Sequence, residues 1–265
     1  MLIHALALIA AALYLASTVM LALPLLHRRM LPRVCGLSLA VIAVLAHGTI
    51  LIGVHSGGVD LHFFAALSLV GACVAALCLL VNVARPVATL GVIVFPLAAI
   101  LLFVDVFLAP HTQPLPIDWQ IKLHVIFAVL GFSVLSVAAV LAILLALQDH
   151  ALRRRQLNGI AAALPPLTLT ETLMFQLIGA GFVLLTVAIL IGLLFVDNLA
   201  AQHLVHKTVL SIAAWIVFGA LLYGRWRHGW RGRRAVRLTL AGMALLLLAF
   251  FGSRFVLELI LKRVP

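Results

Sequence analysis

Long apolar segments constrain this sequence more than any other feature. A helix that crosses a membrane needs about 20 predominantly apolar residues to span roughly 30 Å of hydrocarbon. Eight segments of the 265-residue chain meet this requirement, namely residues 2–26, 34–54, 61–83, 87–108, 121–147, 172–196, 207–224 and 238–261. Hydrophobic residues make up 66% of the chain and charged residues only 9%, whereas about 25% of a soluble domain is charged. The sequence therefore predicts an all-α, polytopic membrane helix bundle with about eight transmembrane helices, and it excludes a water-soluble enzyme.

The distribution of basic residues predicts the orientation of these segments. Thirteen arginines lie in the odd-numbered connections, whereas the even-numbered connections hold only Lys122 and Lys207. Because positively charged residues accumulate in cytoplasmic loops, we expect both termini to face the outer, periplasmic side. The net charge of +11 then reflects contact of the basic connections with anionic lipid headgroups. We expect the lipid bilayer, and not a nucleic acid, as the partner of this surface.

Two local patterns fall on the predicted cytoplasmic side. Trp226 and Trp230 lie in the most basic connection and are typical of an interfacial anchor. Thr168 followed by Glu171 is typical of a capping box, in which two side chains satisfy free backbone N–H groups at the start of a helix. This pattern predicts that Thr168 caps the sixth span.

Histidine is the residue type whose number is unusual, and eight of the eleven histidines lie in the outer half or outer loops of the predicted topology. His124 enters the fifth span within its first turn, and His206 begins the seventh. His47 lies about 10 Å below the outer end of the second span, at 1.5 Å per residue. An imidazole is costly in lipid without a partner, so we expect His47 to face the bundle.

These histidines are candidates for binding a cofactor. Imidazoles from two helices can ligate a haem iron on opposite faces, and the flat apolar macrocycle suits a slot between helices. Zinc is the alternative ligand, but no tight spacing of histidine, cysteine and carboxylate residues supports it.

Arg254, in the outer third of the eighth span, is a candidate partner for an anionic ligand. Its planar guanidinium group matches a carboxylate such as a haem propionate. Glu258, one helical turn further on, can instead form a local ion pair with it. Asp105, near the outer end of the fourth span, is another candidate partner. The sequence leaves these alternatives open.

Several motifs in the second half of the chain match one protein family. They are Leu123-His124-Val125, the segment 171–195, His206-Lys207-Thr208 with Trp215, and Phe251-Gly252. Over residues 121–260 the chain resembles the CcsA-type cytochrome c assembly proteins, which belong to a haem-handling membrane protein superfamily. Three segments resemble in particular the YpjD/HemX-like branch, a bacterial inner-membrane group: HKTVLSIAAW, GRWRHGWRGRRA and LALQDHALR.

No connection between the predicted spans is long enough to be a domain, so the sequence predicts a single integral membrane domain over residues 1–265 with four N-terminal spans in 1–120. The resemblance adds that residues 121–265 form a CcsA-like four-span half. It implies a protein of the bacterial inner membrane that binds or handles haem b at the outer face, with cytochrome c assembly components as partners.

The same resemblance implies a set of site residues. His124 lies at the position of an external haem-iron ligand. The tryptophan-rich outer loop of the superfamily has no counterpart in residues 197–205, and no histidine follows the last span. His206 or His203 is then expected as the second iron ligand, with His47 and Arg254 as further cofactor-binding residues.

Two other classes of function stay open on the sequence alone. The chain would serve as a permease or transporter subunit if the outer pocket admitted a small solute or a metal ion. It would serve as a non-catalytic partner of another membrane protein if its arginine-rich face were a docking surface. No arrangement of nucleophile, base and acid can be identified from the spacing of residues, so the sequence assigns no catalytic residue.

Overall fold

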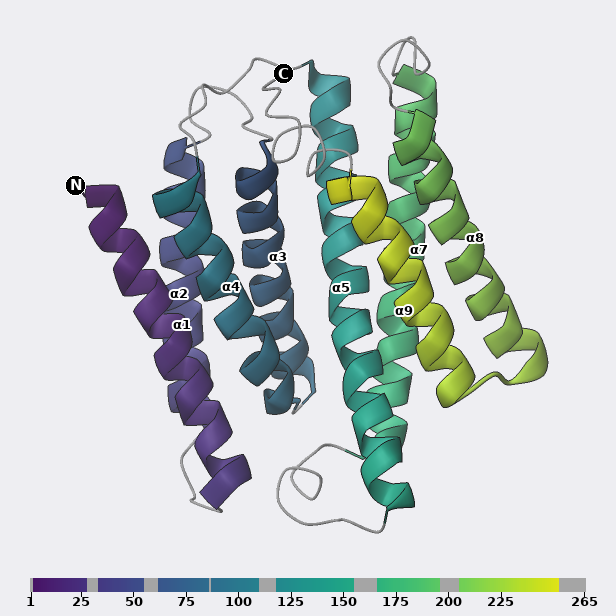
Figure 1. Cartoon of the computed structure of the whole chain (residues 1–265), viewed down its shortest axis with the longest axis horizontal. Helices are drawn as coiled ribbons and strands as arrows, with labels where there is room; N and C mark the ends of the chain where they lie inside the picture. The colour runs from purple at the N-terminus through teal and green to yellow at the C-terminus, as the bar shows by residue number, and fades with distance from the viewer. Residues whose placement is uncertain are drawn as a thin grey trace. The chain divides into compact units, whose positions relative to one another are not determined.

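The described residues of the computed structural model form helices joined by short connections. The structure describes residues 2–27, 33–54, 62–85, 87–109, 118–154, 166–195 and 205–252. The helices, drawn in Figure 1, are α1 Leu2–His27, α2 Arg33–Val54, α3 Phe63–Ala84, α4 Ala88–Leu108, α5 Trp119–Arg153, α7 Leu167–Phe195, α8 Val205–His228 and α9 Arg233–Leu247, followed by a π-helical turn, η1, at Leu248–Gly252. Among the described residues, eight helical segments are long and apolar enough to cross a membrane. Within this part of the chain the all-α class and eight candidate spans agree with the prediction, and the orientation of the termini stays a prediction.

A helix is the form that these segments must take if they lie in hydrocarbon. No water is available there to bond an unpaired backbone N–H or C=O group, and a helix satisfies these groups within one segment. Two prolines lie inside helices, Pro24 in α1 and Pro96 in α4. Membrane helices tolerate proline because neighbouring helices and side chains satisfy the backbone groups that it frees.

Several helices extend beyond the apolar segments that predicted them, and α5 and α9 are examples. α5 has 35 residues, about 52 Å at 1.5 Å per residue, and continues past residue 147 to Arg153. An ion pair of 3.0 Å between Arg153 and Asp149, one turn apart, lies in this polar extension. α9 begins at Arg233 and not near residue 238. Apolar character marks only the part of a helix suited to hydrocarbon, whereas the backbone hydrogen bonds continue into polar sequence.

The contacts divide the chain into two units, which are described separately. Unit 1 comprises Met1–Pro116 with Leu147–Pro166, and unit 2 comprises Ile117–Ala146 with Leu167–Pro265. In unit 1, α1 packs against both α2 and α4, and α4 also packs against α3. Small residues such as Ala7 and Ala10 lie at the centre of this packing with Ile50 and Leu102, and small side chains allow membrane helices to approach closely.

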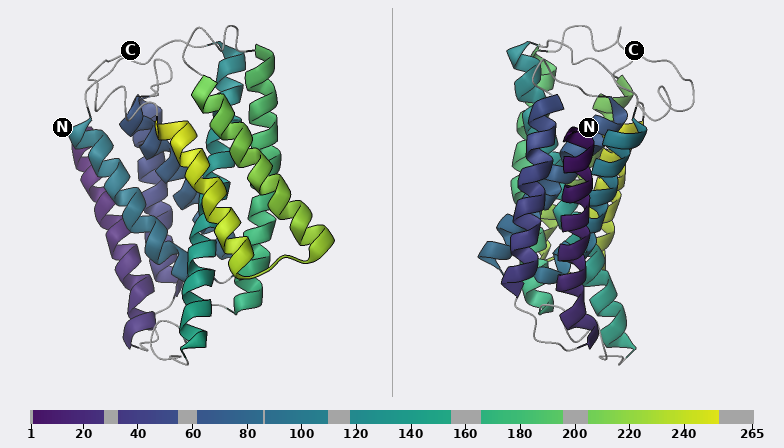
Figure 2. Two further views of the ribbon diagram at one scale, coloured as in Figure 1. Left: turned by 45° about the vertical axis from the view of Figure 1, so that its right-hand side comes forward. Right: turned by 90° about the vertical axis from the view of Figure 1, so that its left-hand side faces the viewer.

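Unit 2 holds α5 up to Ala146 together with α7, α8, α9 and η1. α8 packs against α7, α9 and η1, and Figure 2 shows α8 and α9 side by side, joined by a short connection. Glycines permit the close approaches: Gly181 of α7 faces Leu135 of α5, and Gly242 of α9 faces the ring of Phe218 on α8. These contacts hold together the four elements that line the pocket described next.

Candidate functional site

A pocket with a volume of ≈ 150 Å³ lies between helices of unit 2. Its walls come from four elements that are distant in the sequence: α5, α7, α8 and η1. Most of the lining is apolar, and the polar groups are one histidine, one lysine and two hydroxyls. The lining residues are His124, Ala128, Leu185, Ala188, Ile189, Gly192, Leu193, Lys207, Thr208, Ser211 and Phe250.

His124 lines this pocket from the first turns of α5, and one of its two ring nitrogens forms a hydrogen bond with the backbone of α7. Its Nδ1 atom lies 2.9 Å from the backbone carbonyl oxygen of Ala188. A carbonyl oxygen can only accept, so Nδ1 must carry the proton in the neutral ring, and the lone pair then resides on Nε2. Within the part of the chain that the structure describes, Nε2 of His124 makes no hydrogen bond. The ring therefore presents a metal-binding nitrogen.

Gly192 provides the space that the His124 ring occupies. A Cβ atom at this position would lie 2.9 Å from Cε1 and 3.1 Å from Nδ1 of the ring. Gly192 follows Ala188 by four residues, so both face the same side of α7. The imidazole thus lies directly on the α7 backbone.

The α8 wall of the pocket carries its other polar groups. Lys207, Thr208 and Ser211 lie in the first two turns of this helix and line the pocket. His206 precedes them, is exposed, and is not among the lining residues. Of the predicted ligands, His124 lines the pocket. His206 does not line it and directly precedes the lining residue Lys207 in the sequence. His203 and Arg254 fall outside the described residues.

His47 belongs to unit 1, where it is fully buried between helices. Its Nδ1 atom lies 3.4 Å from the hydroxyl of Tyr14 on α1, and its Nε2 atom lies 3.1 Å from the hydroxyl of Ser68 on α3. The Tyr14 ring is stacked on Phe95 of α4, with centroids 6.0 Å apart. His47 faces the bundle as predicted. Its role in cofactor binding stays a prediction, and hydrogen bonds at both nitrogens already account for its burial.

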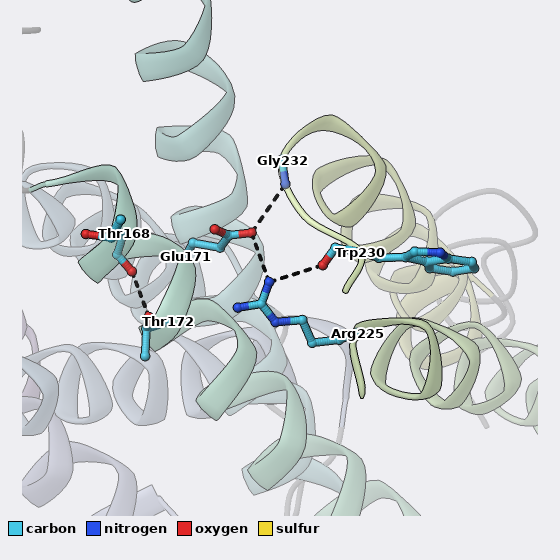
Figure 3. A network of polar contacts seen from close by, with 6 residues as sticks. All are labelled: Thr168, Glu171, Thr172, Arg225, Trp230 and Gly232. Carbon is cyan, nitrogen blue, oxygen red and sulfur yellow. Dashed lines mark hydrogen bonds and ion pairs between the residues drawn. The ribbon is translucent and has the colours of Figure 1, made fainter. Parts of the chain in front are cut away.

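A second polar cluster joins α7 to the connection between α8 and α9 (Figure 3). Glu171 of α7 forms an ion pair of 3.5 Å with Arg225 and accepts a hydrogen bond of 3.3 Å from the backbone N–H of Gly232. Arg225 in turn donates to the carbonyl oxygen of Trp230 at 3.3 Å. Its guanidinium group lies 4.5 Å from the centroid of the Phe175 ring.

This cluster corrects the predicted capping box. α7 begins at Leu167, so both Thr168 and Glu171 lie within the helix. The carbonyl oxygen of Thr168 accepts from the hydroxyl of Thr172, and the Glu171 carboxylate binds partners in another element. The prediction of a cap was wrong because a sequence motif cannot show which donors a long acidic side chain will meet.

The sequence motifs did not indicate that Ala188, Gly192 or the α8 hydroxyls belong to the site. The spacing of two small residues four apart in α7 was the available signal, because small residues mark close helix contacts in membranes. Among the described residues, no three histidine, cysteine, aspartate or glutamate side chains come together as a metal site. The pocket thus offers one imidazole ligand within an apolar wall.

Comparison with known proteins places most of the chain in one family model. Residues 31–261 match the model described as "Cytochrome C assembly protein". The chain is 40% identical over 137 residues to the inner membrane protein YpjD of Escherichia coli (strain K12), which covers 52% of each chain. It is 30% identical over 90 residues to the cytochrome c biogenesis protein CcsA of Gloeobacter violaceus, which covers 33% of this chain and 27% of that protein.

The matched region spans about half the length of the curated YpjD relative, and less of CcsA. A protein of Azospirillum brasilense described only by its mass and gene neighbourhood is 36% identical over 143 residues, 53% of each chain. No solved structure matches the chain.

Proposed function

Because this chain belongs to the cytochrome c assembly protein family, we propose that it is an inner-membrane protein that binds haem b in the pocket of unit 2, with Nε2 of His124 as an iron ligand. Its similarity to the inner membrane protein YpjD and its eight candidate spans support the location. One observation carries the haem proposal. In a largely apolar pocket, the His124 ring is hydrogen-bonded through Nδ1 to the carbonyl oxygen of Ala188, which leaves the lone pair on Nε2 for a ligand.

The donor set suits haem better than a bare metal ion. A protein usually holds zinc with three or four of its own ligands, and the described residues contain no such cluster. Haem supplies an iron that is already held by its macrocycle and that needs only axial ligands from the protein. A single imidazole on an apolar wall meets that smaller requirement.

The size of the pocket bears on how haem would be held. Ligand pockets usually measure about 300–1,000 Å³, and this one measures ≈ 150 Å³. We therefore propose that only part of the macrocycle enters the pocket and that the rest of its apolar surface contacts lipid. Lys207 lines the same pocket, and its positive charge would attract a propionate. His206 or His203 would supply the second iron ligand. The roles of His47 and Arg254 in binding a cofactor stay predictions from the sequence, and the pocket of unit 2 is proposed without them.

The proposal places this haem at the outer face of the membrane, because the distribution of arginines predicts that the amino-terminal end of α5 faces outward. Residues 197–205, which connect α7 to the start of α8, contain no tryptophan. We propose that the chain binds or stores haem there without a tryptophan-rich loop for presenting it. This describes a haem-associated protein of cytochrome c biogenesis that has no catalytic residue of its own.

The test is the haem content of the purified protein, measured as the pyridine haemochrome spectrum per mole of chain. The protein should be purified in mild detergent from cells supplied with haem. The wild-type chain is expected to carry haem, and His124→Ala is expected to lose most of it because the iron loses an axial ligand. His206→Ala is expected to lower the content as well.

His228→Ala is the matched control. His228 is an exposed histidine of unit 2, as His206 is, but it lies at the other end of α8, away from the pocket. Its haem content should equal that of the wild type. A wild-type chain without haem, or full haem content in both His124→Ala and His206→Ala, would overturn the proposal.

A further inference from the structure

We infer that the α7 backbone at Ala188 and Gly192 is a positioning element that sets the tautomer and orientation of His124. The inference rests on the proposed function insofar as His124 is taken to ligate haem iron. It assigns Nε2 as the ligating atom, and it gives the carbonyl of residue 188 and the missing side chain of residue 192 a role in binding the cofactor.

A hydrogen bond links the ring of His124 to the backbone of α7. The carbonyl oxygen of Ala188 lies 2.9 Å from Nδ1 of His124. A carbonyl oxygen has two lone pairs, so it can accept from the imidazole in addition to the backbone N–H four residues later in the helix. This acceptor belongs to the main chain. A backbone carbonyl on the other nitrogen is a common way in which proteins fix the ring orientation and tautomer of a ligating histidine.

The ring of His124 also approaches the backbone of α7 closely at Gly192. A Cβ atom on Gly192 would lie 2.9 Å from Cε1, 3.1 Å from Nδ1 and 3.9 Å from Nε2 of His124. A methyl group there would push against the edge of the ring that carries Cε1 and Nδ1. The ring would have to move away from α7, and that movement would lengthen the hydrogen bond to Ala188.

The glycine at position 192 is explained by this contact and not by the backbone. Gly192 lies within the regular part of α7, and it is not one of the glycines with a positive φ. Glycine in a helix interior is destabilising relative to alanine. The backbone conformation therefore gives no reason for glycine at this position. The contact with the His124 ring does.

The experiment compares Gly192→Ala with Gly179→Ala. Both glycines lie in α7, and a Cβ atom at residue 179 would meet nothing within 4 Å. Protein labelled with ¹⁵N-histidine is placed in lipid bilayers without haem, and the ¹⁵N resonances of His124 are identified by their loss in His124→Ala. These resonances report directly which ring nitrogen carries the proton, so this readout does not depend on haem.

The wild type and Gly179→Ala are expected to show His124 protonated at Nδ1. Gly192→Ala is expected to show a shift of population toward protonation at Nε2. Haem affinity, measured by titration, is expected to fall about tenfold or more in Gly192→Ala, the usual effect of removing the group that orients a metal-ligating histidine. It should be unchanged in Gly179→Ala.

The two proposals fail in different ways. A wild-type His124 protonated at Nε2 would overturn the positioning role, and so would a Gly192→Ala variant with the wild-type tautomer. The wild-type measurement keeps this test valid even if Gly192→Ala does not fold. If instead the tautomer shifts as expected but no variant and no wild-type protein binds haem, the positioning role stands and the proposed function is wrong.

Discussion

His47 and His124 both lie in apolar helices, yet they differ in the ring nitrogens that their hydrogen bonds leave available to a ligand. Tyr14 and Ser68 occupy both ring nitrogens of His47 within unit 1. The ring of His124 is bonded at Nδ1 only, among the residues that the structure describes. The number of ring nitrogens already engaged in hydrogen bonds therefore distinguishes these two histidines as candidate ligands, whereas their depth along the span does not.

Ser68→Ala tests the hydrogen bonds of His47. The substitution removes the partner of Nε2 and leaves a buried polar atom unsatisfied, which costs about 1–3 kcal/mol. We expect the free energy of unfolding, measured by titration from mild detergent into dodecyl sulfate, to fall by an amount in this range. Ser38→Ala is the control, because Ser38 is an exposed serine whose hydroxyl bonds to the carbonyl oxygen of Cys35 in its own helix. Equal stability of the two variants would show that the Ser68 contact contributes nothing.

At the scale of secondary-structure elements, the connection between α8 and α9 is held by specific contacts. Two of its glycines, Gly229 and Gly232, have φ angles of 65° and 58°, a backbone region that other residues rarely adopt. The Trp230 ring lies against Gly224 of α8, and the guanidinium group of Arg234 lies 5.0 Å from the centroid of that ring. Together with the ion pair of Glu171 (Figure 3), these contacts order a segment that its charge alone would mark as a solvated loop.

Gly224→Ala is expected to release this connection. A Cβ atom on residue 224 would overlap the Trp230 ring, so the ring would have to leave its place against α8. We expect trypsin to cleave the variant faster than the wild type after the arginines at 231, 233 and 234, as followed by mass spectrometry. Gly219→Ala serves as the control in the same helix, because its Cβ would make only an ordinary contact of 3.4 Å with Phe182. Unchanged cleavage of Gly224→Ala would argue against this packing.

At the scale of the whole molecule, the chain consists of two helical units and belongs to the cytochrome c assembly protein family. The pocket and the polar connection both lie in unit 2, the first at the beginning of α5 and α8 and the second at the end of α8. The buried polar contacts of His47 lie in unit 1. In the predicted orientation, the pocket lies on the periplasmic side and the arginine-rich connection in the cytoplasm.

Labelling of single cysteines tests that orientation. In a chain whose native Cys35, Cys73 and Cys78 are replaced, Asp118→Cys would lie at the outer end of α5 and His228→Cys at the inner end of α8. A membrane-impermeant maleimide is expected to label the first in intact spheroplasts and the second only after permeabilisation, because the excess of arginine predicts that the connection of His228 is cytoplasmic. The reverse pattern would invert the topology and move the proposed haem site to the cytoplasmic side.

The sequence by itself determined the helical class, the number of spans and the family motifs around His124, because apolar length, charge and short motifs are properties of neighbouring residues. It also singled out His124 as a candidate ligand. The tertiary structure decided which atom of that histidine is available, why residue 192 is glycine, and where the Glu171 carboxylate binds. The contact of His124 with Ala188 joins residues that are 64 positions apart, and the contact of Glu171 with Gly232 joins residues that are 61 positions apart. No local sequence pattern specifies which faces of two membrane helices pack against each other.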